Sequence, residues 1–204
     1  EVMWGFGTSA NPANLGDLGS AAVAANSVAQ VARQLATVVS FGLSSATAIY
    51  LGKTIGEGKL ELAKAYSRRF IVLSVVMGLA GGLLILLAIP VAVSVLSLTL
   101  QAKGYLKIMF CIMAYFVVAQ AYNTTMVVGT FRSGGDTRFG LILDVSTMWG
   151  CSILFGALAA FVWKWSVPAV YVILMSDELI KVPITTFRYL QYRWLRNVTR
   201  EEIS

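Results

Sequence analysis

Several long apolar segments of this chain contain ionisable side chains, which are costly in a membrane unless they have a partner or face water. Asp144 lies several residues inside one such segment, with no opposite charge within helical reach. It is a candidate cation or proton site, and the alternative that it lies near the membrane interface in water stays open. Glu1 lies one helical turn before Trp4 and also has no basic residue within helical reach. Among the acids, Glu1 is the strongest candidate for ion coupling.

A second group of charges lies in the last apolar segment. Asp177 and Glu178 precede Lys181 by four and three residues, so either carboxylate can pair with the ammonium within one helix. We interpret these three residues as a structural ion pair.

Polar residues in another segment recur at alternating spacings of four and three residues, which places them on one helix face. They are Asn26, Gln30, Arg33, Thr37, Ser40, Ser44 and Thr47. This face either lines a hydrated passage or packs against another polar helix face, as Ser and Thr often do in membranes. Arg33 favours a cavity or an acidic partner, because an unpaired cation there would be expensive.

The segments that carry these groups have the composition of membrane spans. The chain is 57% hydrophobic and 13% charged, whereas a soluble domain has roughly 25% charged residues. A span needs about 20 mostly apolar residues. Six segments are predicted as spans: residues 1–15, 22–51, 70–89, 106–128, 139–163 and 168–192. We therefore expect an all-α membrane protein in which residues 1–204 form one six-helix bundle. Because the first segment is short and no initiating Met precedes it, we also expect that bundle's first helix to be truncated.

Basic residues alternate between the predicted loops in the way that the positive-inside rule requires. The rich loops and the tail hold Lys53, Lys59, Lys64, Arg68, Arg69, Arg132, Arg138, Arg188, Arg193, Arg196 and Arg200. The opposite loops hold only Lys103, Lys107 and Lys164. This pattern predicts a cytoplasmic carboxy terminus. It also accounts for the net charge of +6 without a nucleic-acid partner.

Signals for enzymes fail on inspection. Gly52, Lys53 and Thr54 match the end of a phosphate-binding loop, but the glycine required five residues before Gly52 is replaced by Thr47. The chain has no histidine, which removes the usual zinc ligands and the base of a serine hydrolase. We expect no enzymatic activity, no organic cofactor and no metal centre.

Four stretches in order carry a family resemblance: Glu1–Gly7, Leu15–Gly19 leading to Val23–Ala25, Gly52–Gly58 followed by Ala63, and Phe131–Thr137. Their order and spacing over nearly the whole chain resemble the second half of a multidrug and toxic compound extrusion (MATE) transporter. Phe131–Thr137 resembles that family's cytoplasmic connector between the fourth and fifth helices of a half.

The resemblance implies two six-helix bundles related by a pseudo-twofold axis along the membrane normal, with substrate held between or within them. This chain would supply the carboxy-terminal bundle, and its partners would be the missing amino-terminal half and the lipid bilayer. The resemblance also implies exchange of Na⁺ or H⁺ for small organic, often cationic, compounds across the plasma membrane, here a bacterial inner membrane. Glu1 matches a carboxylate of the seventh helix that binds the coupling ion in one branch of the family, so Na⁺ could bind there.

That branch also uses an Asp in the tenth helix, where this chain has Ala121. Gln120, Asn123 or Asp144 could be proposed as substitutes. The candidates for lining a cavity are Asn26, Gln30, Arg33, Thr37, Gln120 and Asn123.

Two alternatives to drug export stay open. A lipid-linked saccharide flippase of related fold would be expected to have a more cationic central cavity than Arg33 and Lys181 provide. A membrane scaffold that transports nothing would use the polar helix faces to bind a protein partner.

Overall fold

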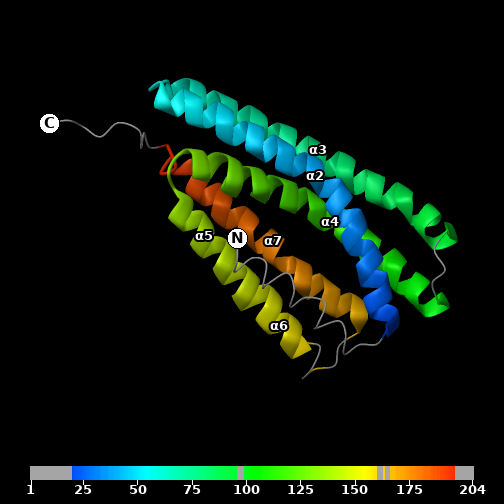
Figure 1. The fold of residues 1–204 in the computed structure, drawn as a ribbon. Helices are drawn as coiled ribbons and strands as arrows, with labels where there is room; N and C mark the ends of the chain where they lie inside the picture. The colour runs from blue at the N-terminus through cyan, green and yellow to red at the C-terminus, as the bar shows by residue number, and fades with distance from the viewer. Residues whose placement is uncertain (1–19, 96–98, 160–162, 164–165, 196–204) are drawn as a thin grey trace.

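The computed structural model describes residues 20–95, 99–159, 163 and 166–195, and every regular element within these ranges is helical (Figure 1). The elements are α2 (Ser20–Gly56), α3 (Leu60–Val95), α4 (Leu100–Thr124), the π-helix η1 (Thr125–Phe131), α5 (Thr137–Ser146), the π-helix η2 (Thr147–Ile153), α6 (Leu154–Ala157) and α7 (Val167–Leu190). Since η1 continues α4 directly, and η2 and α6 continue α5, these elements form five long helical segments.

The five segments pack as a bundle in which α4 and α7 are central. α2 and α3 contact each other and α4, while α7 contacts α4, η2 and α6 (Figure 1). The first predicted span, residues 1–15, lies outside the described residues.

The expectation of six membrane spans was wrong for the part of the chain that the structure describes. Three helices there are long and apolar enough to cross a membrane: Val23–Gly56, Leu60–Ser94 and Leu100–Phe131. The segment predicted at 139–163 corresponds to the continuous helical segment of α5, η2 and α6, which is not among these three. The segment predicted at 168–192 corresponds to α7, which is not among them either and carries the three charged residues Asp177, Glu178 and Lys181 in its middle.

The basic loop predicted between residues 53 and 69 is also shorter than expected. α2 ends at Gly56 and α3 begins at Leu60, so Lys64, Arg68 and Arg69 lie on the first turns of a helix. The reversal between them uses Gly58, whose φ of 74° lies in the left-handed region that favours glycine.

The outward faces of α2 and α3 are rich in large apolar side chains. Leu35 is 71% exposed and Ile49 70% exposed on α2, and Leu84 is 64% exposed on α3. A contiguous apolar surface of this kind is unusual for a soluble monomer and is typical of helices that face lipid.

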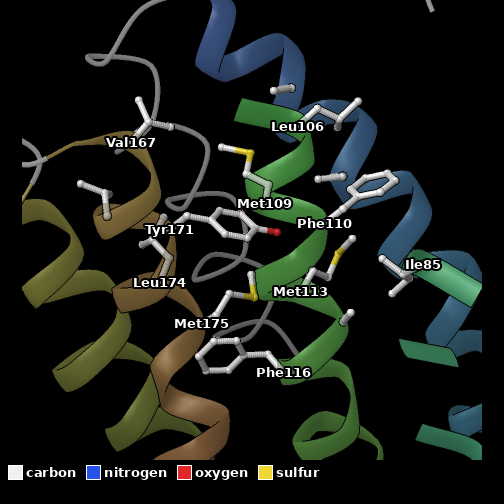
Figure 2. Close-up of a cluster of buried hydrophobic side chains, with 14 of the residues drawn as sticks. Ile85, Leu106, Met109, Phe110, Met113, Phe116, Val167, Tyr171, Leu174 and Met175 are labelled. Atoms are coloured by element: carbon white, nitrogen blue, oxygen red, sulfur yellow. The ribbon is translucent and has the colours of Figure 1, made fainter. Parts of the chain in front are cut away.

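Two hydrophobic clusters fill the bundle. The larger joins α2, α3, α4 and α7 and is rich in methionine and aromatic side chains (Figure 2). Its labelled members include Met109, Phe110, Met113, Tyr171 and Met175. The smaller cluster comprises Leu51, Ile55, Ala63, Val127, Phe131 and Trp194. It lies near the α2–α3 turn and the end of α7.

α3 and α4 approach each other closely through glycines of α3, as small residues allow in membrane helices. A Cβ added at Gly82 would lie 2.6 Å from the carbonyl oxygen of Ala114, and one added at Gly78 would lie 3.0 Å from the Cα of Val118. Both contacts are with the backbone of α4, which cannot move aside without shifting the helix.

We expect Gly82→Ala to lower the free energy of unfolding by about 1–3 kcal/mol, because the added methyl group overpacks the α3–α4 contact. Gly42→Ala on α2 is the matched control, since no atom lies within 4 Å of its added Cβ. Denaturant unfolding in detergent micelles, followed by far-ultraviolet circular dichroism, measures both variants. A Gly82→Ala protein as stable as Gly42→Ala would contradict this close packing.

Candidate functional site

A buried cluster of charges centres on the ammonium of Lys181 in α7. Its Nζ lies 3.2 Å from Oδ1 of Asp144 in α5 and 3.2 Å from Oδ2 of Asp177, one turn earlier in α7. Oε1 of Glu178 lies 3.9 Å away. One cation thus joins three carboxylates from two helices, and the four groups together carry a formal excess of negative charge.

The members of this cluster differ in their access to the surroundings. The side chain of Lys181 is 5% exposed, that of Asp177 9%, and that of Glu178 15%, whereas that of Asp144 is 35% exposed. Asp144 is therefore the open edge of the cluster. Taking charges out of water is expensive, so each buried carboxylate depends on the shared ammonium and on hydrogen bonds.

Asn123 in α4 fixes one side of the cluster. Its Nδ2 donates hydrogen bonds to the backbone oxygen of Glu178 at 2.6 Å and to Oε2 of the same residue at 2.9 Å. Thr185 in α7 donates to Oδ1 of Asn123 at 3.4 Å and to the backbone oxygen of Lys181 at 2.9 Å. These bonds hold Glu178 against α4, and within the cluster it is Lys181 that contacts α5.

Arg33 lies in a second polar group, between α2, α4 and α7. Its Nε donates to Oε1 of Gln120 at 3.1 Å, and its Nη1 lies 3.6 Å from the sulfur of Met175. The partners of Arg33 in these contacts are therefore an amide and a thioether, and no ion pair of Arg33 with an acid occurs among the described residues.

The remaining polar face of α2 divides into two parts. Asn26 is buried, and its Oδ1 has no hydrogen-bond partner within the part of the chain that the structure describes; Gln30 is half-buried. Farther along α2, Thr37 donates to the backbone oxygen of Arg33 at 2.9 Å, and Ser44 donates to that of Thr124 at 3.2 Å. Thr47 lies against η1, where a Cβ added at Gly129 would be 3.0 Å from the Cβ of Thr47. Ser44 and Thr47 thus pack against the α4–η1 helix, whereas the lining of a passage by Asn26, Gln30, Arg33 and Thr37 stays a prediction.

The sequence-predicted site residues are brought together unevenly. Asp144 joins the group of Asp177, Glu178 and Lys181. Helical spacing does not predict this contact, because it indicates partners on one helix and Lys181 lies on another. Glu1 lies outside the described residues. Among those residues, no group of three or more histidine, cysteine or acidic side chains is arranged to hold a metal ion.

A second ion pair joins α7 to the beginning of α5. Arg188 donates from Nε to Oδ2 of Asp136 at 2.8 Å and from Nη2 to Oδ1 at 3.0 Å. The guanidinium also lies 4.6 Å from the ring centroid of Phe139. Asp136 precedes Asp144 by eight residues and Arg188 follows Lys181 by seven, so the two pairs are successive links between antiparallel helices. This spacing is the sequence signal that could have paired Asp144 with Lys181.

Comparison with known proteins gives one family. The MatE family profile matches residues 13–158, which contain Asn123 and Asp144 and end before α7. No solved structure matches the chain.

Proposed function

Because the chain belongs to the MatE family of multi-pass membrane transport proteins, we propose that it forms part of a secondary active multidrug efflux transporter. Members of this family are transporters and not enzymes. In the proposed activity, Na⁺ or H⁺ moves down its gradient in exchange for organic, often cationic, compounds. The chain would be the carboxy-terminal bundle, with the basic loops and the tail on the cytoplasmic side of the plasma membrane of a bacterium.

The observation that best supports ion exchange is the charge cluster around Lys181. Asp144 is a partly exposed carboxylate in an otherwise apolar bundle, and its partner comes from another helix. Binding of a cation or proton at such a group changes the balance of charges between two helices, and so favours one arrangement of them over another. Glu1 stays proposed as a coupling acid, because it lies one helical turn before Trp4 with no basic residue within helical reach and matches the family's carboxylate.

The charges of the cluster also bear on the compound that is carried. Asp144, Asp177 and Glu178 outnumber Lys181, so the field there favours cationic compounds. A flippase for a lipid-linked saccharide phosphate would require an excess of basic over acidic groups.

The test is reconstitution into proteoliposomes that contain a fluorescent organic cation. The proposal requires a preceding half of the transporter. We expect a protein that joins that half to this chain to release the cation when an inward Na⁺ or H⁺ gradient is imposed. The chain alone should release none, because it lacks the opposing wall for alternating access. Gradient-driven release by the chain alone, or none by the joined protein, would count against the proposal.

A further inference from the structure

Two links between α5 and α7 differ in what their cations can do. Arg188 forms a fork with both oxygens of Asp136, and its guanidinium also contacts the ring of Phe139. A planar guanidinium in a bidentate pair has little freedom to exchange partners. Lys181 instead carries a compact ammonium on a flexible stem, and three carboxylates lie within 4 Å of it.

The three carboxylates around Lys181 are not equivalent. Asp177 and Glu178 lie on the same helix as the lysine, so contacts with them do not hold α5 to α7. Asp144 lies on α5, and its bond to Lys181 is the second charged link between these helices. If that carboxylate became neutral, the ammonium would still have two acids on its own helix.

We propose that Lys181 is the positioning residue that converts proton binding at Asp144 into separation of α5 and α6 from α7. This inference deepens the proposed function, on which it rests, by naming the ion and the moving element. A hydronium ion from water gives its proton to the Asp144 carboxylate, which becomes a neutral acid. Lys181 keeps all its protons and moves to Asp177 and Glu178, while the Arg188–Asp136 pair stays closed as the pivot.

Three features of the surroundings support this sequence of events. Asp144 is the most exposed of the three acids and therefore the least enclosed by protein. Asn123 holds Glu178 in place and carries no charge itself. The other charges that act on the acids are Arg132, beyond η1, on Asp144, and Arg33 of α2 on Asp177. Neither makes an ion pair with Asp144 among the described residues, so neither replaces Lys181 as the link to α7.

A proton also fits this geometry better than a metal cation. The ammonium of Lys181 already occupies the point where the three carboxylates converge, so a metal ion would have to displace it and collect the same oxygens. A proton needs only one oxygen of Asp144.

The separation can be measured by pulsed electron-spin distances in the complete transporter, after replacement of Cys111, Cys151 and any other cysteines by serine. Spin labels at the exposed Leu154 of α6 and Val172 of α7 lie beyond both links, on the side away from the pivot. We expect the distance between them to increase by at least about 1–2 Å, the scale of helix shifts in switching proteins, when the pH is lowered. Asp144→Asn should show the longer distance at every pH.

Lys181→Gln should lose the pH response and show the longer distance throughout, because no cation then links Asp144 to α7. Glu61→Gln is the matched control: Glu61 pairs with Lys64 on the surface of α3 and takes no part in the cluster, so the pH response should persist. If Lys181→Gln does not insert, the double variant Lys181→Gln with Asp177→Asn carries the same test with less uncompensated charge.

A pH response that survives in Lys181→Gln or in Asp144→Asn, or that is lost in Glu61→Gln, would overturn the role of Lys181. The same variants are also assayed for efflux. A pH-dependent distance that requires Lys181, in a protein without ion-driven efflux, would support the switch and reject the proposed transport. Proton-driven efflux with a distance that never changes would reject the switch and support transport.

Discussion

Asp144→Asn is expected to lower gradient-driven efflux of an organic cation by about 5–150-fold, the range of a typical coupling free energy between two sites. The amide keeps the shape of the side chain but can neither take up a proton nor pair with the ammonium of Lys181, 3.2 Å away in the native protein. Folding and membrane insertion should survive, because the substitution removes a charge from a cluster with an excess of acids. The measurement is the initial rate of efflux at equal amounts of inserted protein.

The matched control for Asp144→Asn is Glu61→Gln. Glu61 pairs with Lys64 at 2.7 Å on the surface of α3, and its side chain is 87% exposed. Its substitution removes one carboxylate from the protein but leaves the cluster intact, so efflux should be unchanged. Equal losses in the two variants would show that net charge matters and that Asp144 has no special role. If Glu1→Gln lowers the efflux rate and Asp144→Asn does not, the coupling site is Glu1 and not Asp144.

Lys181→Ala is expected to have the largest effect on stability. Removing one partner of a buried ion pair typically costs about 3–5 kcal/mol, because the remaining charge stays buried without compensation. Here three carboxylates lose the ammonium that they share, within a site where the lysine side chain is 5% exposed. The free energy of unfolding in detergent micelles should fall by about that amount.

Two further variants separate this effect from a general loss of lysine. Adding Asp177→Asn to Lys181→Ala should recover part of the stability, since it removes one uncompensated acid. Lys59→Ala breaks the surface pair with Glu57, in which the lysine side chain is 60% exposed, and should leave the unfolding free energy almost unchanged. If Lys181→Ala is as stable as Lys59→Ala, the cluster does not hold α5 and α7 together.

The helices that face lipid could be predicted from the sequence because long apolar runs are a strong local signal. The segments expected at 22–51, 70–89 and 106–128 lie within α2, α3 and the α4–η1 helix, respectively. The predicted ends lie too far inside these helices, because the apolar pattern places Lys64, Arg68 and Arg69 in a loop, whereas they lie on α3. A helix can continue beyond the membrane with charged residues, and the apolar pattern alone does not show where it ends.

The site could be predicted only in part, because its central contact joins distant positions in the sequence. The spacing of Asp177, Glu178 and Lys181 places them within one turn, and the structure brings them together. The bond from Lys181 to Asp144 depends on how the segment of α5, η2 and α6 lies against α7, where η2 and α6 make the packing contacts, and no pattern within a single helix shows this. The contacts of Arg33 with Gln120 and Met175 likewise join three helices.

The polar face of α2 shows why residue spacing does not separate packing from function. Asn26 and Thr47 belong to the same periodic pattern. Thr47 packs against Gly129 of η1. Oδ1 of Asn26, by contrast, is buried and has no hydrogen-bond partner among the described residues. The two residues differ in the helix that packs against them, and a periodic pattern within α2 gives no information about that helix.

The most direct test of the central claim is a counterflow measurement in proteoliposomes that contain the complete transporter. An organic-cation gradient is imposed with no initial pH or Na⁺ gradient, and internal pH and Na⁺ are followed with separate fluorescent indicators. We expect protons to move opposite to the organic cation in the native protein, and this counterflow to be lost in Asp144→Asn and unchanged in Glu61→Gln. Movement of the organic cation without a countermovement of H⁺ or Na⁺, or equal proton counterflow in Asp144→Asn, would contradict an exchanger coupled through Asp144 and Lys181.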